Sequence, residues 1–315
     1  MKRMLFNRKL AWTVTKVITA LLLLVLPGTG CNKEPSGSNP FFEQILNPDA
    51  VRVDMVRVEG GTFTMGCTSE QCEDCLENES PAHSVTLSTF YIGKYEVTQG
   101  QWKEVMGNTI IQHRDFWDPD WPLRGEGDNY PMYYVSWNEI VGTSGASTTI
   151  NGITYYENGF IYKLNQMTGK QYRLPTEAEW EFAARGGNNN SGFKYSGSNT
   201  IDNVAWHYYN SDNSTHPVGT KAPNELGIFD MSGNVREWCS DWYSSSYYDI
   251  SPQNNPQGPS TGSYRVTRGG SWNIVYSGST GEQIMGTERV SDRGFFQPPT
   301  SHYSLLGFRL ASSSN

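Results

Sequence analysis

The chain has 315 residues, enough for one large domain or two modest ones, and its formal net charge is −8. Phosphate binding needs clustered lysine and arginine side chains, so this acidic balance argues against nucleic acid as a partner. Glycine and proline are abundant and aromatic residues make up 13% of the chain, which favours irregular backbone packed around aromatic anchors.

The first fifty residues have the layout of an export signal followed by a linker. A basic stretch ends at Lys16, residues 17–26 form a short apolar run, and small residues lead to Cys31. Ten apolar residues are too few to span a bilayer, so we expect a signal peptide over 1–30. The small residues before Cys31 resemble a bacterial lipoprotein cleavage site, although Gly28 stands where leucine is usual. We therefore expect a lipid on Cys31, a linker over 31–50 and a domain over 51–315.

A lipid on Cys31 would tether the protein to a membrane of the bacterial cell envelope, and we expect the outer membrane. An ordinary signal peptide, cut nearby and leaving Cys31 unmodified, is the alternative. Removing residues 1–30 takes away five basic residues and no acidic ones, which leaves a net charge of −13.

The domain begins with alternating apolar and polar residues. Residues 55–66 predict a strand, a Gly-Gly turn and a second strand, and residues 84–97 alternate again. Thr98 is the expected N-cap of a helix over 99–106, and Ser136 that of a helix opening at 135–141. Thr176, with Glu179 three residues later and Pro175 before it, predicts the clearest helix, over 176–185.

Four cysteines remain beside Cys31, namely Cys67, Cys72, Cys75 and Cys239. Outside the cytoplasm an even set suggests disulfides, and three pairings are open. A zinc site would want a second Cys/His pair, which is missing near His83. The acidic loop around Cys72 and Cys75 opposes thiolate chemistry, so structural disulfides or idle thiols are expected rather than catalysis.

Four segments in one order carry a family resemblance. They are Arg173-Leu-Pro-Thr-Glu-Ala-Glu-Trp-Glu-Phe-Ala-Ala-Arg185, the stretch from Asn224 to Trp238 with Ser232-Gly-Asn-Val-Arg-Glu237, Arg268-Gly-Gly-Ser-Trp272 and Gly307-Phe-Arg-Leu310. Together they resemble the sulfatase-modifying-factor family, whose founding members are formylglycine-generating enzymes. The resemblance runs from about Met55 to Ala311. It implies an α+β, C-type-lectin-like fold with low regular secondary structure and many loops.

The chain departs from the family pattern at two places. In the family the helix near Ser136 usually runs straight on to the Arg-Leu-Pro-Thr motif, whereas here residues 142–158 intervene, with 153–156 as a predicted hairpin arm. The family also places its catalytic cysteine pair just after Arg-Gly-Gly-Ser. Here Ile274 and Met285 lie in that region and the last cysteine is Cys239. We therefore expect no catalytic residues of the family type and no copper, since copper needs the thiolate pair.

The resemblance also implies structural calcium held by two loops. In one, Glu237 would supply a carboxylate and Ser232, Gly233 and Val235 backbone oxygens. The other matches Asn203 and Val204, with Asp212 as the expected acid. The alternative for the first loop is that Glu237 pairs with Arg236 or Arg268 and holds no metal.

The sequence supports the remaining candidate sites less strongly. Ser271 matches the family's pocket serine, so Ser271, Trp272 and Arg268 mark a candidate pocket. A hydrolytic triad of Ser271, His302 and Asp292 has little support, because no nucleophile elbow is present. The five histidines show no paired spacing, and the helical domain that brings iron ligands in other family branches is missing. The aromatic residues of 206–272 are expected in the core, with 243–248 as a candidate recognition surface.

The interpretation favoured by these features is a cell-envelope lipoprotein whose domain is a non-catalytic scaffold or binding module. Its partners would be the membrane, through the lipid, and an unidentified protein or small-molecule ligand. The main alternative is a divergent formylglycine-generating-type oxidoreductase acting on a protein or small molecule. A lesser alternative is a component of a multi-protein secretion or motility complex.

Overall fold

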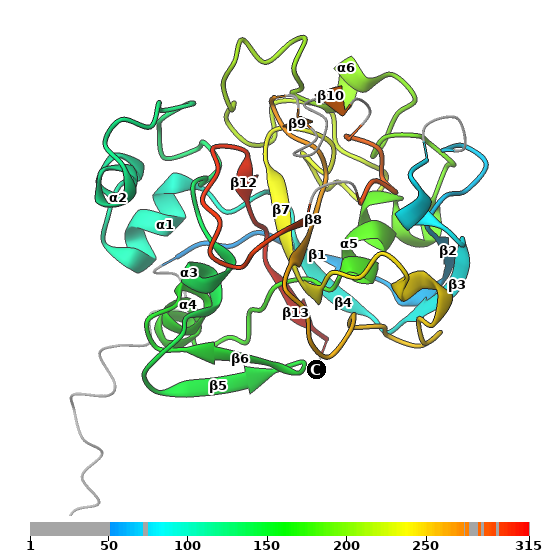
Figure 1. Ribbon diagram of the computed structural model, residues 1–315, viewed down its shortest axis with the longest axis horizontal. Coiled ribbons are helices and arrows are strands. Elements are labelled where there is room, and N and C mark those ends of the chain that lie inside the picture. The colour runs from blue at the N-terminus through cyan, green and yellow to red at the C-terminus, as the bar shows by residue number, and fades with distance from the viewer. Residues whose placement is uncertain are drawn as a thin grey trace, which may run out of the picture. The chain divides into compact units, whose positions relative to one another are not determined.

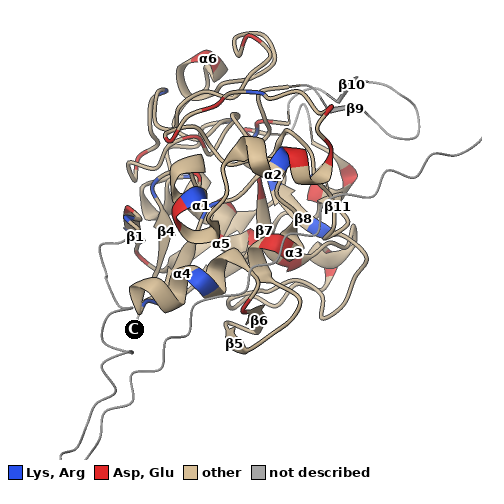
Figure 2. Ribbon diagram, turned by 90° about the vertical axis from the view of Figure 1, so that its left-hand side faces the viewer, with Lys and Arg blue, Asp and Glu red and all other residues tan. Residues whose placement is uncertain are grey.

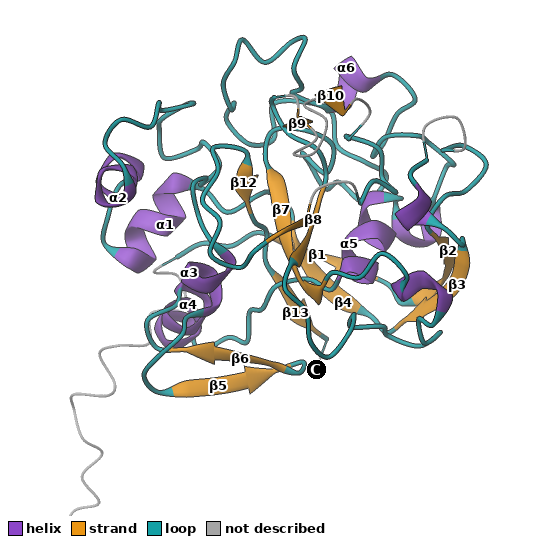
Figure 3. Cartoon of the chain, viewed as in Figure 1, coloured by secondary structure: helices purple, strands orange, loops and turns teal. Residues whose placement is uncertain are grey.

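Short strands and helices joined by long loops make up the domain, as Figure 3 shows. The structure is a computed structural model that describes residues 51–71, 75–273, 287–293 and 296–314, together with the backbone of 275–276 and 283–284. All of these residues fall in one compact unit. None of the helices in this described part is long and apolar enough to cross a membrane.

A four-stranded sheet occupies the middle of the domain in the order β11-β8-β7-β12 (Figure 1). Its strands are β7 (Arg236–Trp242), β8 (Arg265–Arg268), β11 (Phe296–Gln297) and β12 (Leu306–Gly307). β8 is antiparallel to β7, and β12 runs parallel to β7. Because β7 is buried along six of its seven residues, its polar side chains need partners inside the protein.

A second sheet joins the two ends of the domain in the order β1-β4-β13. Its strands are β1 (Met55–Val58), β4 (Phe90–Gly93) and β13 (Ala311–Ser313). β2 (Gly61–Met65) pairs with β3 (His83–Leu87) in a separate ribbon. The strands predicted at 55–66 are confirmed, whereas the alternating segment 84–97 forms two strands that belong to different sheets.

The predicted helices are confirmed, and each begins with the expected cap. α1 (Gln99–Met106), α3 (Trp137–Val141) and α5 (Glu177–Ala184) follow Thr98, Ser136 and Thr176, whose hydroxyl groups accept hydrogen bonds from the N3 backbone amides. The sequence analysis did not identify α2 (Ile110–Trp117), α4 (Phe160–Thr168) or α6 (Ile201–Val204). The remaining elements are the strands β5 (Ser147–Ile150), β6 (Ile153–Tyr156), β9 (Val275–Tyr276) and β10 (Gln283–Ile284), and 3-10 helices at Glu77–Glu79, Gly187–Asn189 and Tyr247–Asp249.

Aromatic side chains anchor the interior, as the composition predicted. Trp102 of α1 stacks on Phe160 of α4 at 5.4 Å between ring centroids, and Phe308 meets the edge of Phe160 at 5.2 Å. Trp180, Trp238 and Trp272 are also fully buried. These rings fill a core in which regular elements are too short to bury large apolar faces.

Five arginines of the described part of the chain are fully buried, which is rare because a buried charge needs a partner. α5 supplies several of these partners, since all eight of its residues are buried, including three glutamates. Glu177 pairs with Arg293, Glu179 with Arg173 and Glu181 with both Arg268 and Arg185. The ion pairs of the three α5 glutamates therefore hold distant segments of the chain against this helix.

Candidate functional site

The Arg268–Trp272 segment, after which the family places its catalytic cysteines, is built into the interior. Arg268 ends β8 and donates to the Glu181 carboxylate of α5 and to the backbone oxygens of Ser291 at 2.8 Å and Asp292 at 2.6 Å. Its side chain is fully buried. Arg268 therefore fastens the segment around residue 291 to α5 instead of facing a ligand.

Ser271 and Trp272 are buried in the same way. The Ser271 hydroxyl donates to the backbone oxygen of Asn273 at 3.0 Å, and the Trp272 indole donates to the backbone oxygen of Ser304 at 3.0 Å. Both residues are at most 1% exposed. The three residues of the predicted pocket thus lie together, but as interior contacts. Ile274 and Met285, which stand in the region of the family's thiols, lie outside the described residues.

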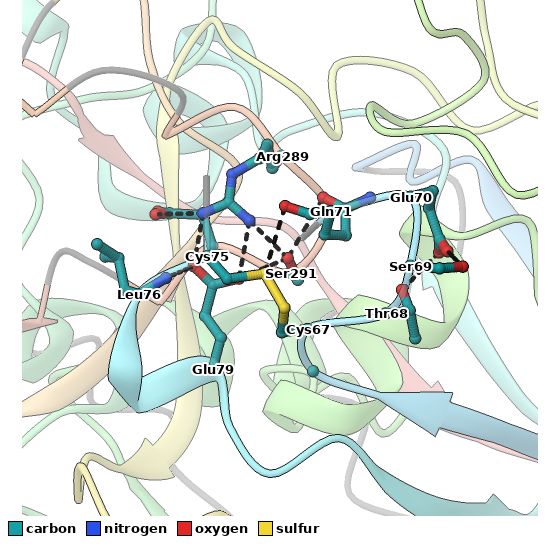
Figure 4. The surroundings of a disulfide bond; sticks show 12 residues. Cys67, Thr68, Ser69, Glu70, Gln71, Cys75, Leu76, Glu79, Arg289 and Ser291 are labelled. Carbon is teal, nitrogen blue, oxygen red and sulfur yellow. Dashed lines mark hydrogen bonds and ion pairs between the residues drawn. A yellow bond between two sulfur atoms is a disulfide. The ribbon is translucent and has the colours of Figure 1, made fainter. Parts of the chain in front are cut away.

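The cysteines that the structure describes are either bonded to each other or buried in the core. Cys67 and Cys75 form a disulfide that closes a loop of the acidic segment (Figure 4). Cys239 is a free thiol inside β7, and burial raises its pKa well above the ordinary value. Cys31 and Cys72 lie outside the described residues. Among the cysteines described, none offers an accessible thiolate for oxidation chemistry.

A buried ion pair stands beside the disulfide, as Figure 4 shows. Arg289 donates to both carboxylate oxygens of Glu79, at 2.8 and 2.5 Å, and Ser291 donates to the same carboxylate at 2.6 Å. These contacts fix the Cys67–Cys75 loop onto the segment that Arg268 holds. The disulfide region is therefore tied to the segment around Arg289 and Ser291.

The first predicted calcium loop holds Glu237 in a different role. Arg309 donates to both oxygens of the Glu237 carboxylate, at 2.5 and 2.6 Å, and the Trp180 indole donates at 2.7 Å. Glu237 thus pairs with Arg309, and not with Arg236 or Arg268 as the sequence alternative proposed. A carboxylate held by a bidentate guanidinium does not fit a calcium ligand. Calcium at this loop would have to rest on the backbone oxygens of Ser232, Gly233 and Val235.

The residues of the second predicted calcium loop lie in different surroundings. The backbone oxygen of Asn203 accepts a hydrogen bond from the Ala222 amide at 3.0 Å, Val204 is buried and Asp212 is exposed with a φ of 53°. Within the described ranges, no group of three or more His, Cys, Asp or Glu side chains is arranged to hold a metal ion. Calcium therefore stays a prediction.

The residues of the imagined triad each have another partner. Asp292 pairs with Arg236 at 3.0 Å, and His302 lies 2.8 Å from the Glu139 carboxylate. Since Ser271 donates to a backbone oxygen, no serine–histidine–aspartate relay forms among the three.

The candidate recognition surface at residues 243–248 is exposed only at Ser245 and Ser246, and its tyrosine rings are half-buried or buried. Tyr247 and Tyr248 are 8% and 3% exposed, and Tyr243 stacks on Phe296 at 3.8 Å between centroids. Arg293 lies 4.0 Å from the centre of the Tyr248 ring and is itself paired with Glu177. The segment's rings therefore cover a buried ion pair.

An exposed aromatic surface lies instead at the end of α2, a helix that the sequence analysis did not identify. We call Phe116, Trp117, Trp121 and His302 the aromatic platform. The ring centroids of Trp117 and His302 lie 4.1 Å apart with the rings tilted, and Phe116 makes a T-shaped contact with Trp117 at 5.1 Å. Phe116 is 77% and Trp117 43% exposed. Only the capping pattern at Thr109 and Gln112 could have predicted α2.

Glu139 of α3 holds the platform in place. Its carboxylate accepts hydrogen bonds from the Trp117 indole at 3.0 Å and interacts with His302 at 2.8 Å. Although burial raises the pKa of Glu139, the contact with His302 helps to bring it below its ordinary value. α2 and α3 with their acidic residues are seen on one side of the molecule in Figure 2. The platform is thus a preorganised aromatic surface beside negative charge.

Comparisons with known proteins agree with this architecture. The model of the sulfatase-modifying factor enzyme 1-like domain matches residues 44–314. The chaperone protein LppX of Paenibacillus barcinonensis is 36% identical over 253 residues, which cover 70% of this chain and 78% of that protein. The formylglycine-generating enzyme of Streptomyces coelicolor is 31% identical, covering 82% and 89%.

The fold has been seen in solved structures as well. Treponema denticola variable protein 1 superimposes with a TM-score of 0.61 at 30% identity, covering 82% of this chain and 95% of that one. This likeness confirms the predicted α+β fold of the formylglycine-generating-enzyme type. The chain belongs to the sulfatase-modifying factor enzyme 1-like family.

Proposed function

We propose that the chain is a non-catalytic binding module of this family that engages another protein at the bacterial cell envelope. The observation that carries the proposal is the absence of any cysteine after Cys239 in the sequence. The family reaction needs two thiols just after Arg-Gly-Gly-Ser. The segment that would present them is retained here as a structural element, with Arg268 tied to Glu181.

The fate of the other cysteines supports the same conclusion. Cys67 and Cys75 are joined to each other, and Cys239 is buried with a raised pKa. A thiol held neutral in the core is a poor nucleophile and a poor metal ligand. The described thiols therefore cannot replace the missing pair without rearrangement of β7 or of the acidic loop.

A protein partner is favoured by the aromatic platform and by one relative. Exposed tryptophan and phenylalanine side chains on a rigid support are typical of protein interfaces. The relative from Paenibacillus barcinonensis is named a chaperone protein, which is a role in binding another protein. We infer that this chain's partner is a protein of the same compartment.

The proposal includes a lipid tether on Cys31 and a place on the outer membrane, both from the N-terminal sequence. Substitution Cys31→Ser is expected to release the protein from the membrane fraction and to abolish incorporation of labelled fatty acid. A variant that stays in the membrane fraction without label would remove the tether from the proposal.

An altered enzyme is the second candidate, because the formylglycine-generating enzyme of Streptomyces coelicolor is 31% identical over most of both chains. The two functions are separated by incubating the purified chain with a cysteine-containing sulfatase peptide, with and without copper. Mass spectrometry should show no aldehyde product, while the Streptomyces coelicolor enzyme under the same conditions serves as positive control. Conversion of the peptide by this chain would overturn the non-catalytic proposal.

A further inference from the structure

A cavity of about 470 Å³ opens between α3, the end of β7 and the β5–β6 hairpin. Its walls include the rings of Trp137, Tyr156 and Trp242, and its rim carries Asn151, Gln257 and Ser260. The volume lies within the usual range for small-molecule sites. None of the predicted pocket residues Arg268, Ser271 and Trp272 lines the cavity, and none of the residues discussed above as calcium ligands does.

The β5–β6 hairpin belongs to residues 142–158, the segment in which this chain departs from the family pattern. The hairpin turn is formed by Asn151 and Gly152, with φ values of 49° and 78°. The Gln257 side-chain amide donates to the Asn151 side-chain oxygen at 2.8 Å and so ties the turn to the loop on the other side of the cavity. One wall of the cavity is therefore an addition of this chain.

Arg265 of β8 supplies the charge in this cavity. Its guanidinium carbon lies 3.7 Å from the centre of the Trp137 ring and 3.4 Å from that of Trp242, so the group is held between two indoles. Arg265 is 5% exposed, and one Nη1 hydrogen bond goes to the backbone oxygen of Ser240 at 2.6 Å. Its Nε is buried without a hydrogen-bond partner in the part of the chain that the structure describes.

Arg265 differs from the arginines of the core in its lack of an ion pair. Arg268, Arg289, Arg293 and Arg309 each form an ion pair with a buried carboxylate, whereas Arg265 forms none with any carboxylate of the described residues. No acidic side chain lines the cavity. Burial lowers the pKa of Arg265 to about 10, so the group still carries its charge at neutral pH.

Burial outweighs the nearby Asp241 carboxylate, which raises the pKa of Arg265 but forms no ion pair with it. A buried guanidinium without an ion pair is costly, and a bidentate carboxylate is the partner that its geometry fits best. The two indoles cover both faces of the guanidinium and leave only its edges for an anion. Nη1 is used by Ser240 and Nε is enclosed by protein, so Nη2 is the nitrogen that remains for an anion among the described residues. The surrounding amide and hydroxyl groups can donate and accept hydrogen bonds with hydroxyl groups of a ligand.

We propose that this cavity binds a small hydroxylated carboxylate, the chemical class of the sugar acids, with the carboxylate on Nη2 of Arg265. The hydroxyl groups of the ligand meet Asn151, Gln257 and Ser260, and its apolar face lies against Tyr156. Phosphate lacks the hydroxylated body, and a neutral sugar lacks the charge, so each should bind more weakly. The site is independent of the aromatic platform and of the missing thiol chemistry.

Calorimetric titration of the purified chain tests the site with D-glucuronate, with D-glucose as the uncharged match and with inorganic phosphate as a second anion. Glucuronate is expected to bind at least about tenfold more tightly than either. Binding of phosphate as tight as that of glucuronate, or no glucuronate binding at millimolar concentration, would overturn the assignment.

Two variant pairs locate the binding. Arg265→Met removes the charge with little change of volume and should abolish glucuronate binding, whereas Arg265→Lys should keep part of it. Because the indole sandwich could fail without arginine, Ser260→Glu provides a test at an exposed residue of the rim, with Ser260→Gln as its neutral match. The glutamate should weaken binding about tenfold by repulsion and the glutamine should not. Equal affinity in the two Ser260 variants would place the ligand elsewhere.

Discussion

The Glu237 carboxylate and the Arg309 guanidinium form a bidentate ion pair, with both side chains fully buried and N–O distances of 2.5 and 2.6 Å. The pair joins the Ser-Gly-Asn-Val-Arg-Glu segment, which leads into β7, to the closing Gly-Phe-Arg-Leu segment. Two of the motifs that mark the family thus meet as partners in one interaction. The ion pair gives the two motifs a shared structural role in the folded chain.

Substitution Glu237→Gln tests this assignment against the calcium prediction. Loss of the carboxylate leaves Arg309 as an unpaired buried charge, so we expect the free energy of unfolding to fall by about 3–5 kcal/mol. Urea unfolding with and without a chelator gives the measurement. The loss should be the same in both conditions if Glu237 serves Arg309.

Chelation of the unmodified protein provides the control for that experiment. Bound calcium would make the melting temperature fall on chelation. If chelation destabilises the unmodified protein and has no effect on Glu237→Gln, then Glu237 is a calcium ligand and the ion-pair assignment is contradicted.

Arg268→Met should destabilise the protein for a related reason. Glu181 is fully buried and keeps Arg185 as a partner, but it loses the shorter of its two arginine contacts, and the backbone oxygens around Ser291 lose their donors. We expect a loss of about 3–5 kcal/mol by chemical denaturation. Arg57→Met is the matched control, because Arg57 pairs with Glu59 at the surface and should change stability by less than about 1 kcal/mol. Similar losses for the two variants would show that Arg268 is not an anchor.

The sequence predicted the fold well where local chemistry decides the structure. The caps at Thr98, Ser136 and Thr176 fixed the starts of three helices, because a hydroxyl that accepts from the N3 amide stabilises a helix end in any context. The family motifs predicted the architecture. Partners of buried charges could not be predicted in this way, since Glu237 meets Arg309 across 72 residues and the pairing depends on the folded chain.

The candidate sites were harder to predict than the fold. Tyr243 and Tyr248 stand in a serine-rich segment that the sequence favours as exposed, yet their rings lie over the guanidinium of Arg293, which is paired with Glu177. The aromatic platform depends on α2 and on His302, which lies 185 residues after Trp117. A surface that is assembled from distant segments leaves no periodic signal in the sequence.

Asp241 makes the stability of the protein depend on pH. Burial, reinforced by the nearby Glu177 carboxylate, raises the pKa of Asp241 from 3.8 to about 7. Between these values the folded protein keeps the proton that the unfolded chain has released. The stability contributed by this group is therefore full below pH 4 and is lost as the pH rises to 7, at roughly 1.4 kcal/mol per pH unit.

Asp241→Asn should remove this dependence. The asparagine can still accept the hydrogen bonds that Asp241 receives from the Glu177 amide and the Ser240 hydroxyl. We expect its stability relative to the unmodified protein to rise steadily between pH 4 and pH 7 in urea unfolding. The same substitution at the exposed Asp249 serves as control. A difference that stays constant with pH would mean that Asp241 is ionised throughout this range.

The aromatic platform leads to a prediction about the protein partner. Trp117 is 43% exposed and donates to Glu139, so Trp117→Ala should reduce stability by no more than about 1 kcal/mol while removing the centre of the platform. A partner cross-linked to the unmodified chain in envelope preparations, and identified by mass spectrometry, should bind the variant more weakly by at least about tenfold. Tyr209→Ala is the control, because Tyr209 is 70% exposed on a different loop and should leave binding unchanged. If both variants keep the partner, the interface lies away from α2; if both lose it, exposed rings in general bind it and the platform has no special role.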